Sequence, residues 1–256
     1  MKIEKVLSVA SPVLEGKTIK DAVIGIALMA VELNDGSIGV SYVLREHLKS
    51  GCSIFPYGQR LIDKDATEIA SWVLNGIDDL QKGIGMAVLN AASQSLNLLD
   101  ENDPQKPFGV MLKDTDTVGI IGYIHPVVNT LGKKAQKIYV FDQGMEEAGD
   151  PAGLIEPMAR QAQILPECDI MVTSGTTLIN GTLDGLLVMC PNVREVILIG
   201  SSTPMYPEAF RGTKITVLAG SWWDKKYKEE IFKNISLAAG IDALRSFVIK
   251  KTVRVP

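Results

Sequence analysis

The 256-residue sequence is poor in the side chains that most often build zinc sites. It has three cysteines, Cys52, Cys168 and Cys190, which lie far apart and form no C-x-x-C pair, and two histidines, His47 and His125. Structural zinc sites need four such ligands at close spacings. This scarcity argues against a zinc site made only of thiolate and imidazole, and the odd number of cysteines predicts free thiols in a reducing cytoplasm.

An excess of positive charge and long apolar runs are also missing. Lys and Arg number 26 against 30 Asp and Glu, and the net charge of −4 offers no basis for binding nucleic acid or an anionic membrane. No uncharged apolar run approaches the ~20 residues that span a bilayer. Glu4 and Lys5 interrupt the start of the chain, unlike a secretory signal. We predict a soluble cytoplasmic protein with no nucleic-acid or membrane partner, and a homo-oligomer is compatible with the sequence.

What the sequence does contain is enough apolar material for a core, at 46% hydrophobic against 22% charged residues. Its first half has the pattern of strands followed by helices. Apolar runs at residues 22–33 and 37–44 flank Asn34-Asp35-Gly36, which is a strong hairpin signal. Apolar residues at helical spacing follow at residues 67–75 and 79–98.

The second half alternates strands with helices. Two prolines make residues 102–109 the predicted linker. The alternation predicts a doubly wound, mostly parallel sheet. We therefore predict an α/β protein with an α+β domain at residues 1–105 and an α/β domain at residues 106–256. The predicted strands are 117–124, 137–141, 169–172, 193–199 and 214–218, with an edge strand at 246–255, and the predicted helices are 126–135, within 152–165, within 177–189, and 227–239.

Three predicted strands end beside a glycine and small polar residues, at 122–126, 173–177 and 200–204. Ligands of open α/β sheets bind just beyond the carboxyl ends of the strands, so these segments predict a small-molecule crevice. The first lacks the full G-x-G-x-x-G fingerprint, which weakens the case for NAD, and the third lacks G-x-S-x-G, which favours binding over a nucleophilic serine. No cofactor is assigned. The candidate ligand-binding residues are Gly122, Tyr123, Thr173, Ser174, Gly175, Thr176, Thr177, Gly200, Ser201, Ser202 and Thr203.

Two residues near the first strand end are candidates for specific roles. Pro126 suits the first turn of a helix and would place His125 at the N-cap, where the helix dipole favours a neutral imidazole that can act as a general base. The alternative is that His125 is a surface residue. Asp142 closes the next strand, about 20 residues further on, where Rossmann-like folds hold a ribose hydroxyl. Many strands also end in Asp because it favours turns.

The densest polar cluster is 173–177, whose hydroxyl and N–H groups at a helix start could hold an anion or a carbonyl group. The alternative is that one hydroxyl caps the helix and the others are solvated. If the helix continues, Thr177, Asn180 and Asp184 share one stripe. Asn180 could then orient a substrate, and Asp184 could accept a hydrogen bond from that substrate or brace Asn180. Otherwise Asn180-Gly181 is a break and Thr182 caps a shorter helix. His125 and Asp184 are the candidate catalytic residues.

From the first half, Tyr42, Arg45, Cys52 and Asn90 are candidates for reaching the crevice. Arg45 could pair with a carboxylate or phosphate. Asn90 lies within an apolar stretch of a predicted helix, where its amide needs a partner. For each of them, packing or a solvated position is the ordinary alternative.

Residues 169–187, followed by Gly200-Ser-Ser-Thr-Pro204, resemble the putative heavy-metal chelation family. The resemblance covers nearly the whole chain and implies an enolase N-terminal-like domain followed by a Rossmann-like domain, with a site between them. It implies binding of a metal–chelator complex, or a condensation or hydrolysis in making a pterin-, flavin- or siderophore-like molecule. The Rossmann-like part is also similar to methyltransferases, although this chain lacks the G-x-G-x-G loop that S-adenosylmethionine binding calls for.

We therefore expect the protein to bind a small polar ligand, heterocyclic or a metal chelate, in the crevice between the two domains. The sequence leaves three activities open. The protein could catalyse a step in the metabolism of that ligand. It could instead be a non-catalytic carrier or sensor of a metal chelate, or a nucleotide- or S-adenosylmethionine-dependent transferase.

Overall fold

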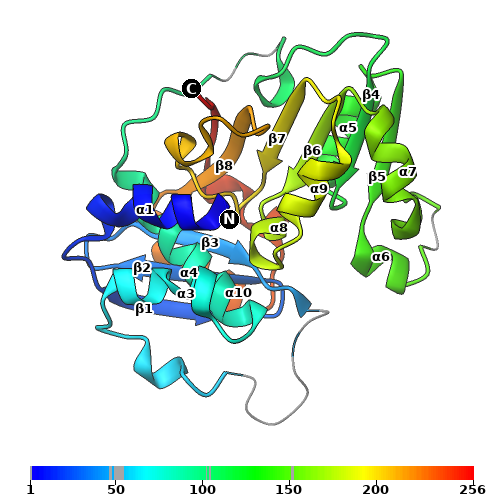
Figure 1. The fold of residues 1–256 in the computed structure, drawn as a ribbon. Helices are drawn as coiled ribbons and strands as arrows, with labels where there is room; N and C mark the ends of the chain where they lie inside the picture. The colour runs from blue at the N-terminus through cyan, green and yellow to red at the C-terminus, as the bar shows by residue number, and fades with distance from the viewer. Residues whose placement is uncertain (1, 46–47, 49–54, 102, 104, 151–152) are drawn as a thin grey trace.

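A computed structural model describes residues 2–256 except 46–47, 49–54, 102, 104 and 151–152. Its first half forms a three-stranded antiparallel sheet in the order β1-β2-β3, accompanied by four helices (Figure 1). These elements are α1 (Lys2–Leu14), β1 (Ile19–Ile24), β2 (Leu28–Leu33), β3 (Ile38–Tyr42), α2 (Ala66–Ala70), α3 (Trp72–Asn75) and α4 (Asp79–Ala92). The predicted hairpin at Asn34-Asp35-Gly36 is confirmed, since it joins β2 to β3.

The predicted strand at residues 22–33 is wrong, because it is two strands joined by a turn. β1 ends at Ile24, and the backbone N–H of Gly25 donates to the carbonyl oxygen of Leu28 across the turn. A Cβ atom on Gly25 would lie 2.3 Å from the carbonyl oxygen of Ile235, in helix α10 (Lys228–Ser236). The turn therefore passes against a helix that belongs to the second half of the chain, a long-range contact that local sequence patterns do not reveal.

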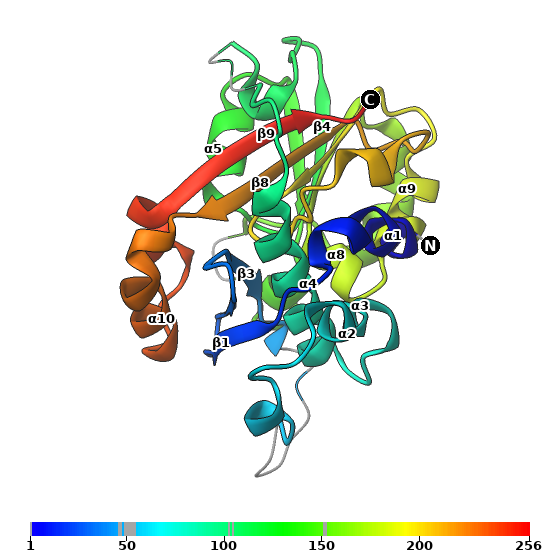
Figure 2. The ribbon, with the colours of Figure 1, turned by 90° about the vertical axis from the view of Figure 1, so that its left-hand side faces the viewer.

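Both faces of the small sheet are covered, and all six residues of β2 are buried. Helix α4 lies against one face, so close that a Cβ on Gly39 would lie 1.9 Å from the carbonyl oxygen of Ala87. On the other face, Ile231 and Ile235 of α10 pack in one cluster with residues of β2 and β3. Figure 2 shows the small sheet between these helices. A helix from the second half thus completes the core of the first, and the division at residue 105 stays a prediction.

The large sheet has six strands in the order β5-β4-β6-β7-β8-β9. The first five in this order are mutually parallel, and the last is antiparallel to its neighbour. The mixed α/β class with a mostly parallel sheet is therefore confirmed. The strands are β4 (Thr117–Ile121), β5 (Lys137–Phe141), β6 (Ile170–Ser174), β7 (Glu195–Ile199), β8 (Val217–Trp223) and β9 (Val248–Arg254).

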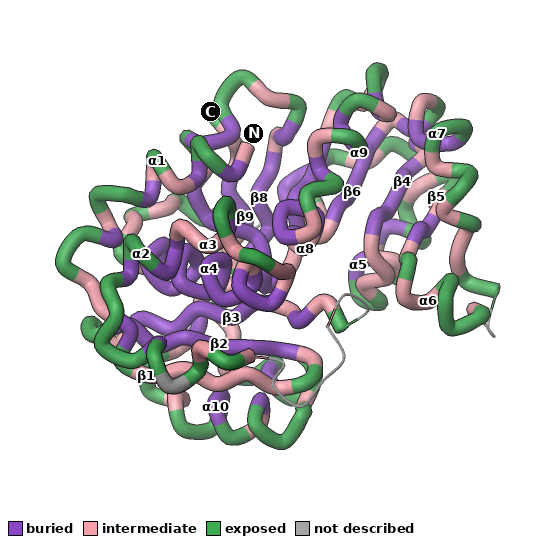
Figure 3. Tube along the Cα trace, turned by 60° about the horizontal axis from the view of Figure 1, so that its bottom comes forward, coloured by how far each residue is buried: buried purple, intermediate pink, exposed green. Residues whose placement is uncertain are grey.

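Helices cover both faces of this sheet. Val127 and Leu131 of α5 pack on one face, and Leu178, Leu183 and Leu186 of α8 and α9 belong to the cluster on the other face. Figure 3 shows buried strands between more exposed helices. Besides α10, the described residues of this half form the helices α5 (His125–Gly132), α6 (Gln143–Glu147), α7 (Gln161–Ile164), α8 (Thr176–Ile179) and α9 (Leu183–Met189).

Two predicted helices are interrupted. Residues 67–75 divide into α2 and α3 at Ser71, and residues 177–189 divide into α8 and α9 at Asn180-Gly181. Gly181 has φ +74°, a left-handed conformation that ends helices and favours glycine. The continuous helix is therefore wrong and the alternative with a break is right.

The strand order reverses beside β4. The chain passes from β4 to β5 on one side, and then crosses to β6 on the other side. At such a reversal the connections leave in opposite directions and open a crevice beyond the carboxyl ends of the strands. Among the described residues, no helix combines the length and apolar composition needed to cross a bilayer.

Candidate functional site

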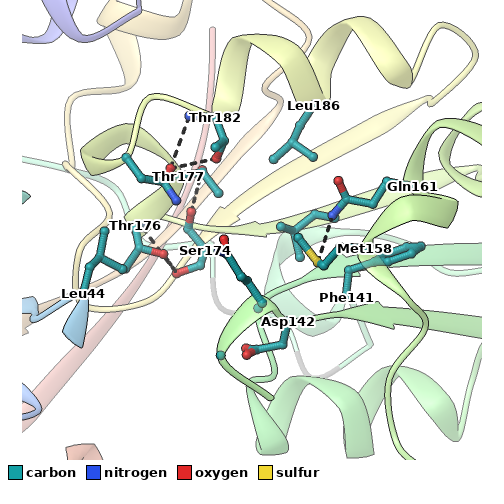
Figure 4. Close-up of a pocket in the computed structure, with 15 residues that line it drawn as sticks. Leu44, Phe141, Asp142, Met158, Gln161, Ser174, Thr176, Thr177, Thr182 and Leu186 are labelled. Carbon is teal, nitrogen blue, oxygen red and sulfur yellow. Dashed lines mark hydrogen bonds between the residues drawn. The ribbon is translucent and has the colours of Figure 1, made fainter. Parts of the chain in front are cut away.

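A cavity of about 190 Å³ lies beyond the carboxyl ends of β4, β5 and β6 (Figure 4). Its described lining residues come from the second half of the chain, apart from Leu44, which follows β3. The cavity therefore lies where the strand order reverses. The lining residues are Leu44, Ile121, Gly122, Phe141, Asp142, Gln143, Gly144, Met158, Gln161, Ser174, Thr176, Thr177, Asn180, Thr182 and Leu186.

One wall of the cavity is formed by hydroxyl and amide groups that follow β6. The Ser174 hydroxyl oxygen accepts hydrogen bonds from the backbone N–H and the hydroxyl group of Thr176, at 3.3 and 2.9 Å. Asn180 Oδ1 accepts from the backbone N–H and the hydroxyl group of Thr182, at 3.2 and 2.7 Å. The break between α8 and α9 turns Asn180 and Thr182 toward the cavity, together with Ser174.

The opposite wall comes from β5 and the segment that follows it. Met158 and Gln161 face the hydroxyl wall across the cavity (Figure 4), and the Gln161 amide lies 3.5 Å from the Met158 sulfur. Leu186 of α9 and Ile121 of β4 add apolar surface. The cavity is thus polar on one side and largely apolar on the other.

Asp142 lines the cavity, but its carboxylate already holds the local backbone together. Oδ1 accepts from the backbone N–H of Met145 at 2.9 Å and so caps α6. Oδ2 accepts from the backbone N–H of Tyr123 at 2.7 Å and so fixes the loop after β4. Both oxygens have partners, which supports the turn-forming interpretation of this residue more than the ribose-binding one.

The two candidate catalytic residues do not line the cavity. His125 is exposed at the first position of α5, with Ile124 as the N-cap, and its Nε2 lies 3.1 Å from the side-chain amide of Asn129. The predicted N-cap placement is therefore wrong by one residue. Asp184 lies in the first turn of α9, 48% exposed, with Oδ1 3.1 Å from the Lys2 ammonium. The stripe that joins Asp184 to Thr177 and Asn180 does not form, because the helix breaks.

The strand end at Gly200–Thr203 does not line the cavity either, since the first half of the chain covers it. Ser202, only 1% exposed, accepts a hydrogen bond from the Tyr42 backbone N–H at 2.9 Å, and its hydroxyl oxygen lies 3.1 Å from that of Ser41. Asn90 donates to the carbonyl oxygens of Val40 and Ser201 at 3.1 and 2.7 Å. We call the contacts made by Ser201, Ser202, Tyr42 and Asn90 the polar lock. Ser201 and Thr203 are also buried.

The remaining predicted residues occupy various positions. Gly122, with φ +95°, lines the cavity, whereas Tyr123 and the buried Thr173 and Gly175 lie next to lining residues. Arg45 is exposed and does not line the cavity, and Cys52 lies outside the described residues.

Several lining residues are absent from the sequence-based prediction, notably Met158, Gln161 and Leu186. None belongs to a strand-end motif, and each reaches the cavity by chain folding. The sequence predicts Thr182 only as a helix cap. The Asn180-Gly181 dipeptide is the sequence signal for the helix break that brings Thr182 to the cavity.

The described residues contain no group of side chains that could by themselves bind a bare heavy-metal ion. No three His, Cys, Asp or Glu side chains among them are grouped so that they could hold one. The buried thiols of Cys168 and Cys190 do not line the cavity. Burial raises the pKa of Cys168 to about 12, helped by the nearby Cys190, and that of Cys190 to about 11 although Lys214 opposes the shift. Both thiols are thus protonated at neutral pH, whereas the thiolate is the form that ligates metals.

Comparisons with known proteins agree with the resemblance found in the sequence. Two family models, both described as putative heavy-metal chelation, match residues 8–93 and 106–254. An uncharacterized protein of Methanocaldococcus jannaschii is 31% identical over 194 residues, which cover 72% of this chain and 70% of that protein.

Two solved structures have a similar fold, and both are described as members of the family whose model matches residues 106–254. One is a protein with unknown function from Pyrococcus horikoshii, with a TM-score of 0.82 and 23% identity over 100% of both chains. The other is a protein with unknown function from Desulfitobacterium hafniense, with a TM-score of 0.75 and 17% identity over 98% of both chains. At these identities the likeness shows the fold alone.

Proposed function

Because this chain belongs to the putative heavy-metal chelation family, we propose that it binds a metal chelate, held through its small organic part, in the cavity beyond β4, β5 and β6. The observation that carries the proposal is the position of this cavity, at the strand-order reversal where α/β proteins bind ligands. Its hydroxyl and amide wall suits a polar organic molecule.

The lining chemistry supports a chelate more than a bare ion. Heavy-metal ions prefer thiolate and imidazole ligands, whereas hydroxyl and amide groups suit them poorly. The described lining residues offer hydroxyl groups, amides and one thioether, that of Met158. In this proposal the metal is cargo, and the protein contacts the organic molecule that carries it.

The lining also favours binding over catalysis. Proton transfer needs a titratable group within hydrogen-bond reach of the reacting atom. Asp142 is the one acidic or basic side chain among the described lining residues, and both of its oxygens accept backbone N–H groups. We therefore propose a carrier or sensor rather than an enzyme of condensation or hydrolysis.

The proposal is tested by identifying what copurifies with the protein and by blocking the cavity. Native mass spectrometry of the purified chain should reveal a bound small molecule. Thr182→Trp should abolish its retention, because Thr182 is exposed at the mouth and lines the cavity. Val188→Trp is the matched control, since Val188 lies on α9, the helix that follows Thr182, is 79% exposed and does not line the cavity.

His125→Ala and Asp184→Asn separate the carrier from an enzyme that uses these residues. Both variants should retain the copurified molecule at the wild-type level, because neither residue lines the cavity. Equal retention by Thr182→Trp and the wild type would contradict the proposed site. Turnover of the molecule by the wild type, lost in His125→Ala or Asp184→Asn, would contradict the carrier.

A further inference from the structure

The cavity has no cationic lining residue among those that the structure describes. Its charged lining residue is Asp142, whose two carboxylate oxygens accept hydrogen bonds from Met145 and Tyr123. Burying a ligand anion beside a carboxylate, without a counter-charge, is unfavourable. The charge distribution therefore disfavours an anionic ligand.

Four backbone amides of the loops after β4 and β6 that could replace a cationic side chain are also engaged. Phosphate-binding folds leave backbone N–H groups free at this position. Here the N–H of Gly122 donates to the carbonyl oxygen of Phe141 at 2.7 Å, and that of Gly175 donates to Ile199 at 2.9 Å. The N–H groups of Tyr123 and Thr176 are taken by Asp142 and Ser174. In the structure, the segments that the sequence predicts as an anion site use these N–H groups for hydrogen bonds within the protein.

The donors left for a ligand are neutral. The Ser174 hydroxyl oxygen accepts two hydrogen bonds from Thr176, which leaves its own hydrogen available. The Asn180 side-chain oxygen accepts from Thr182, and the Asn180 NH₂ group has no hydrogen-bond partner among the described residues. Ser174 faces the Met158 and Leu186 side of the cavity (Figure 4), and Asn180 also lines the cavity. A fitting ligand has acceptor atoms along one edge and an apolar body.

The volume limits the size of this ligand. Engineered cavities of about 150 Å³ bind benzene, so about 190 Å³ is room for one or two fused rings.

We propose, on the basis of the function proposed above, that the cavity selects an uncharged organic molecule of one or two rings, with acceptor atoms toward Ser174 and Asn180, and rejects phosphate-bearing and other anionic ligands. The polar edge meets the hydroxyl wall, and the ring body packs on Met158, Leu186 and Ile121. The selectivity is set by the missing positive charge rather than by shape.

Two probes of equal size test this selectivity. 8-Hydroxyquinoline-5-sulfonamide and 8-hydroxyquinoline-5-sulfonate share a metal-chelating bicycle and differ by one negative charge. Calorimetry on the full-length protein, without added metal, should give the sulfonamide at least about tenfold tighter binding, which corresponds to ~1.4 kcal/mol. Inorganic phosphate should not compete with it.

A charge change at Gln161 sharpens the test. Gln161→Lys puts an ammonium group on the Met158 side of the cavity at similar side-chain length, and should narrow or reverse the preference. Gln161→Met, which is neutral, should keep it. Thr182→Trp should abolish binding of the sulfonamide, and Val188→Trp should not.

The outcomes separate this inference from the proposed function. Equal or tighter binding of the sulfonate to the wild type, lost in Thr182→Trp, would overturn the inference and leave the cavity as the binding site. Sulfonamide binding that Thr182→Trp does not weaken would overturn the cavity itself. Failure of both probes to bind the wild type would overturn the inference, whereas the proposed function is judged by the copurified molecule.

Discussion

Two loops at the carboxyl edge of the large sheet are built from the same residue types and have different surroundings. The loop after β6 contains Ser174, Gly175 and Thr176 and borders the cavity, whereas the loop after β7 contains Ser201 and Ser202 and is buried under β3 and α4. The hydroxyl groups of the first contact one another and the cavity. In the second, the Ser202 hydroxyl group accepts from the Tyr42 backbone N–H, and the Ser201 carbonyl oxygen accepts from the Asn90 side chain.

The comparison indicates that a polar strand end becomes a candidate ligand site only where the chain segments that leave adjacent strands diverge. The loop after β6 lies beside the strand-order reversal, so no element packs over it completely. The loop after β7 lies inside the sheet, on a side that the first half covers. There, buried polar groups need protein partners, and Ser202 and Asn90 supply them.

The largest effect is expected where the two loops touch. A Cβ on Gly175 would lie 2.4 Å from the carbonyl carbon of Ser202 and 2.5 Å from the backbone nitrogen of Thr203. Gly175→Ala should therefore lower the free energy of unfolding by about 3 kcal/mol, because backbone atoms cannot move aside. Urea denaturation measures it.

Gly185→Ala provides the control for that substitution. Gly185 lies within α9, and no atom lies within 4 Å of the position its Cβ would take. This change should raise the free energy of unfolding by roughly 0.5–1 kcal/mol through helix propensity. Equal stability of the two variants would show that the loops do not press on each other.

The next effect compares one substitution at both loops. Ser202→Ala removes a buried hydroxyl group that accepts from the Tyr42 backbone N–H, and should cost about 2 kcal/mol of unfolding free energy. Ser174→Ala, at the half-buried edge of the cavity, should cost less than about 1 kcal/mol, but should weaken binding of the quinoline sulfonamide several-fold. Urea denaturation and calorimetry measure the two effects. A larger loss of unfolding free energy in Ser174→Ala than in Ser202→Ala would contradict the distinction between the polar lock and the cavity.

The smallest effect concerns pH. Burial raises the pKa of the Tyr42 phenol to about 12, with a contribution from the Asp242 charge, against an ordinary value of 10.0. A raised folded-state pKa favours the protonated form, so its stabilisation is full below pH 10 and is lost as the pH rises toward 12. At pH 11 the loss is about 1 kcal/mol.

Tyr42→Phe isolates that contribution. The variant should lose less stability between pH 9 and pH 11 than the wild type in denaturant titrations, while Cys168 and Cys190 contribute equally to both proteins. Parallel pH profiles for the two proteins would show that the Tyr42 phenol does not have a raised pKa in the folded protein.

Much of the fold could be predicted from the sequence because its signals are local. The Asn34-Asp35-Gly36 turn specifies a hairpin by its conformational preferences, and the alternation of strands and helices after residue 106 specifies a mostly parallel sheet. Asp78 and Asp142 each accept a backbone N–H at the start of the helix that follows them. Such caps depend on neighbouring residues alone.

The candidate site was less predictable because it depends on contacts between distant segments. Met158, Gln161 and Leu186 reach the cavity only after β5, α7 and α9 pack together. Gly25 and Gly39 permit close approach of α10 and α4, and their sequence neighbours give no sign of these partners. His125 looked like a catalytic residue by its place before Pro126, but α5 turns it outward to solvent.

The fold class, the family and the three polar strand ends can be read from local sequence. Turns, caps and hydrophobic periodicity depend on residues that are close together in the chain. The tertiary structure decided which strand ends border the cavity and which are covered. It also decided that the amides of Gly122 and Gly175 bind neighbouring strands instead of remaining free. The physical reason is that a hydroxyl or amide group is specified by the chain, whereas its partner is chosen by packing between segments far apart in sequence.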